Sequence, residues 1–155
     1  MTKPVPLTDF ARQPTTCTAR TDAGLPPAID RVAERAAETH RFLRRQWFSA
    51  AIDSYGGAPR TIVIERDGAA LLALPVVPAG PAALKLVQVP GAYWPFRSFP
   101  VREAAGPGIF ALALSELATH ANGLRIGPVY DDDATAMPLI AAARDAGWAV
   151  LPRYI

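Results

Sequence analysis

The stretch TIVIERDGAALLALPVV, residues 61–77, decides the fold of this chain. It contains a β-rich run from Thr61 to Arg66, a strong two-residue turn signal at Asp67-Gly68 and a return strand from Ala70 to Val77. Because Pro75 has no backbone N–H to donate, we expect the return strand to lie at a sheet edge or to carry a bulge. The stretch therefore predicts an antiparallel hairpin.

The segments on both sides of this hairpin carry further strand and helix patterns. Leu84 to Val89 alternates as a third strand, which extends the hairpin to a meander. Pro26-Pro27 opens a helix, since proline is favoured in a first helical turn, and apolar residues recur at helical spacing as far as Leu43. The other expected elements are helices over Gln46 to Tyr55, Ile109 to Ala121 and a segment ending at Ala146, and strands over Leu124 to Tyr130 and Trp148 to Ile155.

This order of elements predicts the fold class and the domain organisation. Two helices, an antiparallel meander and then βαβα units imply an α/β protein with a mixed sheet and helices on both of its faces. Residues 1–25 show no sustained apolar period, so we expect a loosely ordered N-terminal arm. Residues 26–155 then form one domain.

The composition narrows the class of protein. The chain has 155 residues, the size of one ordinary domain, and its 50% hydrophobic and 19% charged residues exclude an intrinsically disordered chain. Its 16 basic and 14 acidic residues give a net charge of +2, too weak a field to indicate nucleic acid as a partner. A single cysteine, Cys17, excludes an internal disulfide. No apolar run reaches membrane-span length and no signal core is present, so we expect a cytoplasmic protein without a membrane partner.

The order of elements and four short segments resemble a known enzyme family. The order resembles the GNAT acyltransferase fold, in which two helices precede a meander and the cofactor loop follows the fourth strand. The local sequence resembles the N-terminal half of proteobacterial tandem GNAT proteins, similar to acetyltransferases of cellulose or exopolysaccharide biosynthesis and, more distantly, to FemAB-type transferases. The segments that carry this resemblance are RQWF (45–48), RDG (66–68), GAYWPFRSFP (91–100) and AGW (146–148).

The resemblance implies a coenzyme A site at one loop. In GNAT proteins a Gln/Arg-x-x-Gly-x-Gly/Ala loop holds the pyrophosphate through backbone N–H groups. The matching residues here are Gln88, Gly91, Ala92 and Tyr93, with Tyr93 in place of the final small residue. Pro90 removes one N–H donor, and the next expected helix begins only near Gly108, well beyond the loop. The loop thus departs from the family's phosphate cradle.

The same loop is unusually rich in aromatic residues. They can plug the sheet edge as core, wall a substrate pocket in which Arg97 binds an anion, or dock another domain. All three interpretations stay open at the level of sequence. The residues concerned are Tyr93, Trp94, Phe96, Arg97 and Phe99.

Candidate catalytic residues come mainly from the resemblance. GNAT enzymes often carry a general base on a meander strand, where Glu65 lies, and can carry a general-acid tyrosine near the position of Tyr130. Each residue also has a structural explanation, as a strand residue or the end of a strand. Asp131-Asp132-Asp133 is expected to cap the helix that follows and not to bind a metal. His40 and His120 are expected to be structural.

The function implied is an N- or O-acyltransferase that uses acetyl-coenzyme A or another acyl-coenzyme A and no metal. Tandem relatives are about twice as long, so a chain of this length is also expected to be an inactive half. Its partner would then be a second GNAT-like half or a second copy of itself. The alternative from another class is a non-catalytic interaction or dimerisation module on a degenerate GNAT fold.

Overall fold

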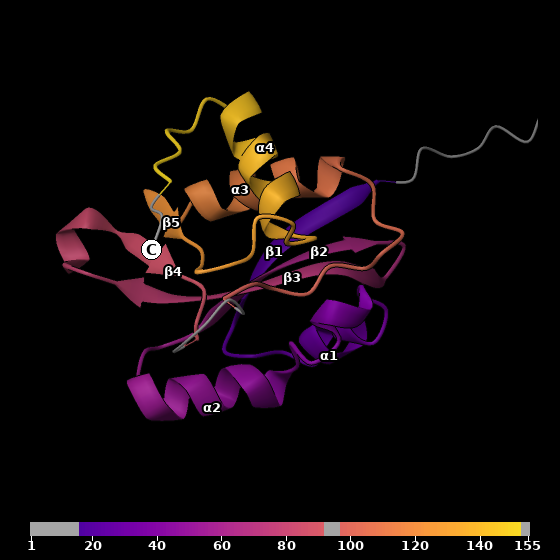
Figure 1. The fold of residues 1–155 in the computed structure, drawn as a ribbon, viewed down its shortest axis with the longest axis horizontal. Helices are drawn as coiled ribbons and strands as arrows, with labels where there is room; N and C mark the ends of the chain where they lie inside the picture. Colours follow the sequence, from indigo (N-terminus) through magenta and orange to yellow (C-terminus); the bar gives the residue numbers. More distant parts are fainter. Residues whose placement is uncertain (1–15, 92–96, 153–155) are drawn as a thin grey trace, which may run out of the picture.

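The computed structural model describes residues 16–91 and 97–152. Within them the chain forms a mixed five-stranded sheet in the order β1-β2-β3-β4-β5, covered by helices (Figure 1). Neighbouring strands are antiparallel except β4 and β5, which are parallel. The strands are β1 Cys17–Ala23, β2 Arg60–Arg66, β3 Ala69–Ala79, β4 Leu86–Gln88 and β5 Gly123–Arg125; the helices are α1 Ala28–Ala33, α2 Arg45–Tyr55, α3 Gly108–Ala118 and α4 Ala136–Asp145, with short 3-10 turns η1 Glu38–His40 and η2 Ala82–Leu84.

The central hairpin confirms the sequence prediction. β2 and β3 pair across the Asp67-Gly68 turn, with Ile62 opposite Leu74, and the pairing is shifted by a bulge between Ile64 and Glu65. Asp67 and Gly68 both have positive φ, +50° and +75°, as a tight turn of the mirror-image type requires. The sequence pattern and the turn chemistry agree, which fixes the register of the sheet at its centre.

Of the two alternatives predicted from Pro75, an edge strand is wrong, because β3 lies between β2 and β4. β3 does carry the extra residue of a bulge, but nearer the hairpin turn than Pro75. On the side away from β2, the N–H of Ala73 donates to the carbonyl of Pro100 at 3.2 Å, and Val77 pairs with Gln88 of β4. Strand alternation puts the nitrogen of Pro75 on this same side, between the two partners. A residue without an N–H is tolerated there because, on the side away from β2, no strand of the described chain pairs with Pro75.

The N-terminal arm is the clearest correction. Residues 1–25 were expected to be loosely ordered, but Cys17–Ala23 form β1, which pairs with β2 along its whole length. The burial of β1 does not alternate, since most of its residues are half-buried, and this hid the strand from the periodicity argument. The part of the arm before Thr16 lies outside the described residues.

The first helix is shorter than its apolar pattern predicts. α1 ends at Ala33 instead of continuing to Leu43. Ala36 forms a bridge with Arg102, and the N–H of Glu103 donates to the carbonyl of Arg35 at 3.0 Å. Backbone groups near Ala36 are thus paired with the segment around Arg102 and are not available for another helical turn. The helix ends because of this contact with a distant part of the chain. α2 begins and ends close to its predicted bounds, with Gly56 at φ +74° after Tyr55.

The C-terminal third contains less strand than expected. β5 stops at Arg125, because Gly127 adopts φ +95° and Pro128 has no N–H to continue a ladder. The segment 148–152 is not a strand; the N–H of Trp148 instead donates to the carbonyl of Ala143 at 2.8 Å and ends α4. The predicted last strand is therefore wrong for its described residues, and residues 153–155 lie outside them.

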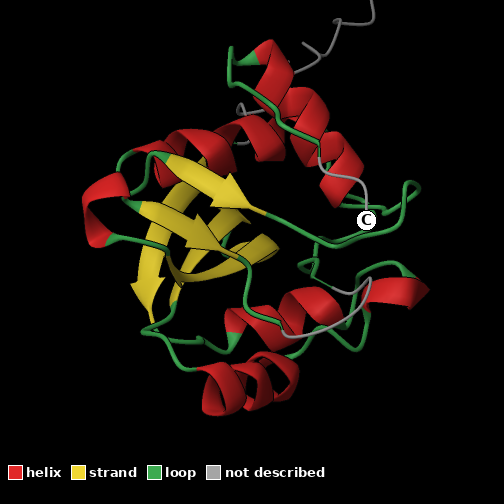
Figure 2. Ribbon diagram, turned by 60° about the vertical axis from the view of Figure 1, so that its left-hand side comes forward, coloured by secondary structure: helices red, strands yellow, loops and turns green. Residues whose placement is uncertain are grey.

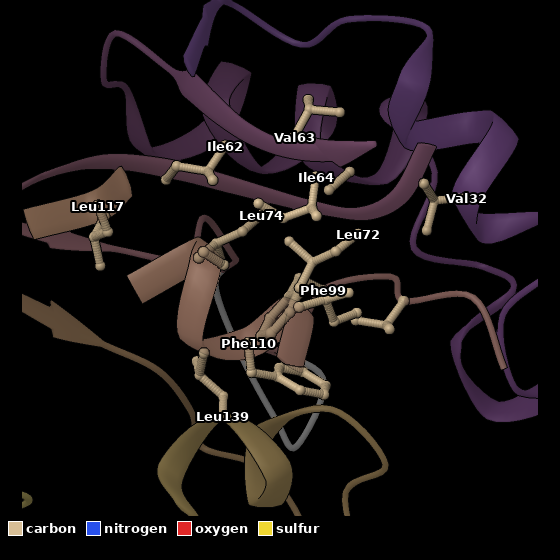
Figure 3. Packing of buried hydrophobic residues seen from close by; sticks show 14 of the residues in the cluster. Val32, Ile62, Val63, Ile64, Leu72, Leu74, Phe99, Phe110, Leu117 and Leu139 are labelled. Carbon is tan, nitrogen blue, oxygen red and sulfur yellow. The ribbon is translucent and has the colours of Figure 1, made fainter. Parts of the chain in front are cut away.

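Helices cover both faces of the sheet, as predicted. In Figures 1 and 2 α1 and α2 lie on one side of the sheet, α3 lies on the other, and α4 packs on α3. The core is one cluster that runs through the sheet and reaches α4 (Figure 3). Fully buried members include Ile29 of α1, Leu72 of β3 and Leu117 of α3. The fold is thus an α+β domain with a mixed sheet.

Candidate functional site

The candidate site lies where the parallel strands β4 and β5 end. Gln88 is opposite Arg125, and the N–H of Val89 donates to the carbonyl of Arg125 at 3.1 Å. Beyond this point the chain leaves β4 and later returns to β3, where Val101 bridges Leu72. The end of the two parallel strands is a common position for ligand sites in open α/β sheets.

Arg97 is fixed at this end of the sheet by its backbone and by its side chain. Its N–H donates to the carbonyl of Pro128 at 3.4 Å, and its carbonyl accepts the N–H of Gly127 at 3.2 Å. The side-chain Nε donates to the carbonyl of Gly91. A Cβ at Gly91 would lie 3.0 Å from Cγ of Arg97, so glycine provides the space for this side chain. The choice of glycine at position 91 therefore helps to determine where the Arg97 side chain lies.

The Arg97 guanidinium lies in a half-buried, positively charged environment. Burial lowers its pKa, and the positive charge of Arg125 lowers it further, partly opposed by Tyr55. Within the described segments 16–91 and 97–152, no carboxylate forms an ion pair with Arg97 or with Arg125. Two neighbouring cations without an acidic partner favour an anion, because its charge would relieve their mutual repulsion.

The predicted coenzyme A loop is placed only in part. Gln88 and Gly91 lie at the end of β4 and beside Arg97, as just described. The other two predicted loop residues, Ala92 and Tyr93, lie outside the described residues, as do Trp94 and Phe96 of the aromatic loop. The described part therefore provides Arg97 and Arg125 as the charged groups that fit phosphate.

Phe99 does not belong to an accessible substrate or partner loop. Its side chain is fully buried within the core cluster (Figure 3). Of the three interpretations of the aromatic loop, Phe99 fits the one in which the ring fills the core. Arg97 fits the structural interpretation through its bond to the Gly91 carbonyl, but its guanidinium retains donors that this bond does not use.

The helix that follows the loop does not begin at the loop. The chain first pairs with β3 at Leu72 and with Ala36 after α1, and α3 starts only at Gly108. The N-terminus of α3 is therefore separated from Gly91 by a stretch of paired chain. Phosphate binding at this site would depend on the arginine side chains and not on a helix N-terminus of the kind the GNAT pattern implies.

The two catalytic candidates are not neighbours on the sheet. Glu65 lies on β2 and forms an ion pair with Arg20 of the edge strand β1. Tyr130 is 59% exposed and follows β5, which ends the described sheet on the opposite side. The Arg20 pair gives Glu65 a structural role at the β1 edge, whereas Tyr130 belongs to the same edge as Arg97.

The structure also contains a buried polar cluster that the sequence analysis did not find. It joins His40 of η1, Ser98, Asp133 and Thr135, all of them buried. Nε2 of His40 lies 3.2 Å from Oδ2 of Asp133 and 3.2 Å from Oγ of Ser98, and Ser98 donates to Oδ1 of Asp133 at 2.9 Å. The four residues come from three distant segments, so no local motif could reveal them.

This cluster contains serine, histidine and aspartate but does not have the geometry of a nucleophilic triad. In such a triad the serine and the carboxylate contact opposite nitrogens of the imidazole. Here both contact Nε2, and Nδ1 of His40 lies 2.9 Å from Oγ1 of Thr39. Ser98 is 1% exposed, and its hydroxyl donates to Asp133. A substrate carbonyl cannot reach it, so the cluster is structural.

Asp133 is the centre of the cluster and caps α4. Its Oδ1 accepts the N–H of Thr135 at 3.0 Å and of Ala136 at 2.7 Å. Burial raises the pKa of the carboxyl, but hydrogen bonds from His40 and from these two N–H groups lower it by more, so the net pKa lies well below its usual range. The predicted capping role of the aspartate run is confirmed for Asp133.

The remaining polar candidates have partners within the fold. Nε2 of His120 lies 3.6 Å from Oε1 of Glu116, and Sγ of Cys17 accepts the Nε–H of Arg66 at 3.3 Å. Across residues 16–91 and 97–152, no group of three or more His, Cys, Asp or Glu is placed to hold a metal ion. In the same part of the chain, no helix has both the length and the apolar character needed to cross a membrane.

Comparison with known proteins does not identify a relative. No protein-family model, no curated protein and no solved structure matches this chain significantly.

Proposed function

We propose that this chain is a GNAT-like domain that transfers an acyl group from acyl-coenzyme A to an amine or hydroxyl. The observation that carries the proposal is the Arg97 guanidinium beside Arg125 at the end of the parallel β4–β5 pair, without an acidic partner in the described chain. Coenzyme A is a polyanion, and its phosphates match this pair of cations. In this proposal the reaction takes place in the cytoplasm, the location expected from the sequence.

The order of elements supports the same proposal. β1, two helices, the β2–β3–β4 meander, α3, β5 and α4 follow the order that the resemblance implies, once β1 is counted as the first strand. In this proposal the domain acts mainly by positioning acyl-coenzyme A and by supplying positive charge: Arg97 and Arg125 hold its phosphates. Tyr130, on the same edge of the sheet, is a candidate general acid. Fold likeness alone does not assign this chemistry, so binding must be measured directly.

Calorimetric titration with acetyl-coenzyme A tests the donor site. We expect saturable binding by the full chain and at least tenfold weaker binding by Arg97→Gln, which removes the charge while keeping a polar side chain. Arg144→Gln is the matched control, since Arg144 is an exposed cation on α4 and is not among the charges that act on Arg97. Absence of binding by the wild-type chain at millimolar ligand rejects the donor site.

Release of the coenzyme A thiol tests the reaction itself. A thiol-reactive dye reports turnover with amine and hydroxyl acceptors, and Cys17, the single cysteine of the chain, gives a fixed background that a no-acceptor reaction measures. Binding without turnover would indicate an inactive half that retains the donor site.

The second candidate function is an interaction module. β5 ends the described sheet, with three residues, and the segment 148–152 does not extend the sheet beyond it. An edge strand presents backbone N–H and C=O groups on which a partner strand can pair. Analytical ultracentrifugation distinguishes the two: a dimer that does not bind acetyl-coenzyme A favours the module, with a second copy as its partner.

A further inference from the structure

A cavity of about 310 Å³ lies at the opposite end of β4 from Arg97. Its walls come from β1, β2, β3, β4 and the end of α3, and η2 closes one side. This is the region where the β3–β4 connection projects from the sheet near the end of α3 (Figure 1). The volume is at the lower end of the range of small-ligand sites, roughly 300–1,000 Å³.

The interior of this cavity is apolar. Ile62 of β2, Val76 of β3 and Leu117 of α3 form its base, and all three are buried in the folded chain. Leu86 of β4 lines the cavity and remains 38% exposed, so part of the apolar surface is open to solvent. Such a surface favours a flexible hydrocarbon chain, which gains most from removal of its methylenes from water.

The rim of the cavity is basic. Arg60, Lys85 and His120 line it, and no aspartate or glutamate belongs to its described lining. Arg60 and Lys85 are exposed and form no ion pair within residues 16–91 and 97–152, whereas His120 lies 3.6 Å from Glu116. Arg60 and Lys85 thus have no acidic partner in the described chain, whereas His120 has Glu116 nearby. We expect such a rim to bind a ligand that carries one negative charge.

The backbone of Lys85 is held in place at this rim. Lys85 has φ +49°, an uncommon conformation for a residue with a side chain. Its carbonyl accepts the N–H of Asn122 at 2.9 Å, and the side-chain amide of Asn122 donates to the carbonyl of Leu84 at 3.2 Å. The connection between α3 and β5 thereby fixes the η2–β4 turn that carries the cation.

From this arrangement we propose that the cavity binds a small aliphatic carboxylate, with its chain on the apolar base and its carboxylate between Arg60 and Lys85. The site is separate from the proposed donor site and does not depend on it. Octanoate is the probe, because its chain and single charge match the two parts of the cavity.

Titration of the full chain with a ligand series is the first test. We expect saturable octanoate binding, roughly tenfold tighter than hexanoate because two methylenes are added. Octylammonium, with the same chain length and the opposite charge, should bind at least tenfold more weakly. Equal affinities for octanoate and octylammonium, or no saturation with octanoate, overturn the proposal.

Matched variants are the second test. Arg60→Gln and Lys85→Asn should each weaken octanoate binding roughly fivefold, since each removes one charge, and asparagine tolerates the positive φ of position 85. Arg144→Gln removes an exposed charge away from the cavity and should bind like the wild type. Thermal unfolding checks that all three fold. If both rim variants bind octanoate like Arg144→Gln, the rim does not recognise the carboxylate.

Competition separates this site from the donor site. Octanoate affinity should not change when coenzyme A is present, whether or not coenzyme A binds the chain. Displacement of octanoate by coenzyme A would place the carboxylate at the β4–β5 end instead and overturn the proposal. Failure of acetyl-coenzyme A to bind would reject the proposed function and leave this site untouched.

Discussion

Arg97 and Ser98 are neighbours in the chain but belong to two different kinds of polar region. Ser98 is buried, and its hydroxyl contacts Asp133, His40 and Thr135. Arg97 is half-buried, and within residues 16–91 and 97–152 its side chain makes one hydrogen bond, to the carbonyl of Gly91. The first region has its hydrogen bonds satisfied and stabilises the fold, whereas the second retains donors for a ligand. The two residues differ in whether their hydrogen-bonding groups already have partners in the protein. This difference, more than the residue type, separates a structural residue from a candidate binding residue here.

The largest expected effect on stability follows from removing the centre of the buried cluster. Asp133→Ala should lower the free energy of unfolding by about 3–5 kcal/mol, because His40 and the cap of α4 both lose their acceptor. Urea denaturation measures the change. Asp132→Ala is the matched control, since Asp132 is exposed, and it should cost less than about 0.5 kcal/mol. Similar losses in both variants would contradict the distinction between the cluster and its surroundings.

A smaller loss of stability is expected when Ser98 loses its hydroxyl. Ser98→Ala should cost about 1–3 kcal/mol, because Asp133 and Thr135 lose a buried partner but the carboxylate keeps its backbone donors. Ser49→Ala on α2 is a control, as Ser49 is exposed and outside the cluster. The double variant Ser98→Ala/Asp133→Ala should cost less than the sum of the two single changes. Additive losses would show that the two residues act independently.

The cluster should also make stability depend on pH. The pKa of Asp133 is lower in the folded chain than in the unfolded chain, where a value near 3.9 is typical. Its contribution is therefore fully present above about pH 4 and is lost as the pH falls below it towards the folded pKa. Unfolding experiments between about pH 2.5 and 6 should show a steeper loss of stability on the acid side for the wild type than for Asp133→Asn. Parallel pH profiles would exclude this role for the carboxyl.

Of the residues in these two polar regions, Arg97 is expected to contribute least to stability. Arg97→Gln should change the free energy of unfolding by less than about 1 kcal/mol, because a partly exposed charge with no ion-pair partner in the described part of the chain contributes little. Its effect should be on acetyl-coenzyme A binding instead, as described above. A loss of several kcal/mol, measured by urea denaturation, would assign Arg97 to the structural region together with Ser98.

The sequence predicted those parts of the molecule that depend on local chemistry. Asp67-Gly68 specifies its turn through backbone conformation, and Gly56 ends α2 in the same way. Asp133 caps the helix that follows it, which requires only neighbouring residues. These features could be found because cause and effect lie within a few positions of the chain.

The features that the sequence could not predict depend on distant partners. α1 stops because Ala36 pairs with Arg102, and β1 exists because β2 offers it an edge. The polar cluster needs His40, Ser98 and Asp133 together, and a single sequence gives no sign of this juxtaposition. Phe99 is core and Arg97 is not, although both lie in the same aromatic segment, because the backbone of Arg97 is bonded to the chain that follows β5, whereas the chain directly after Phe99 returns to β3.

The cluster has a consequence for the order in which the molecule assembles. Three of its hydrogen bonds join residues 58, 93 and 35 positions apart, so each of them needs two of three distant segments to meet: η1, the end of the aromatic loop and the start of α4. Closing such large loops is slow and costs chain entropy before any bond repays it. We therefore expect the contacts of Ser98 to form after the folding transition state. Stopped-flow measurements should find that Ser98→Ala accelerates unfolding and leaves the folding rate nearly unchanged, so that the cluster sets the lifetime of the native state.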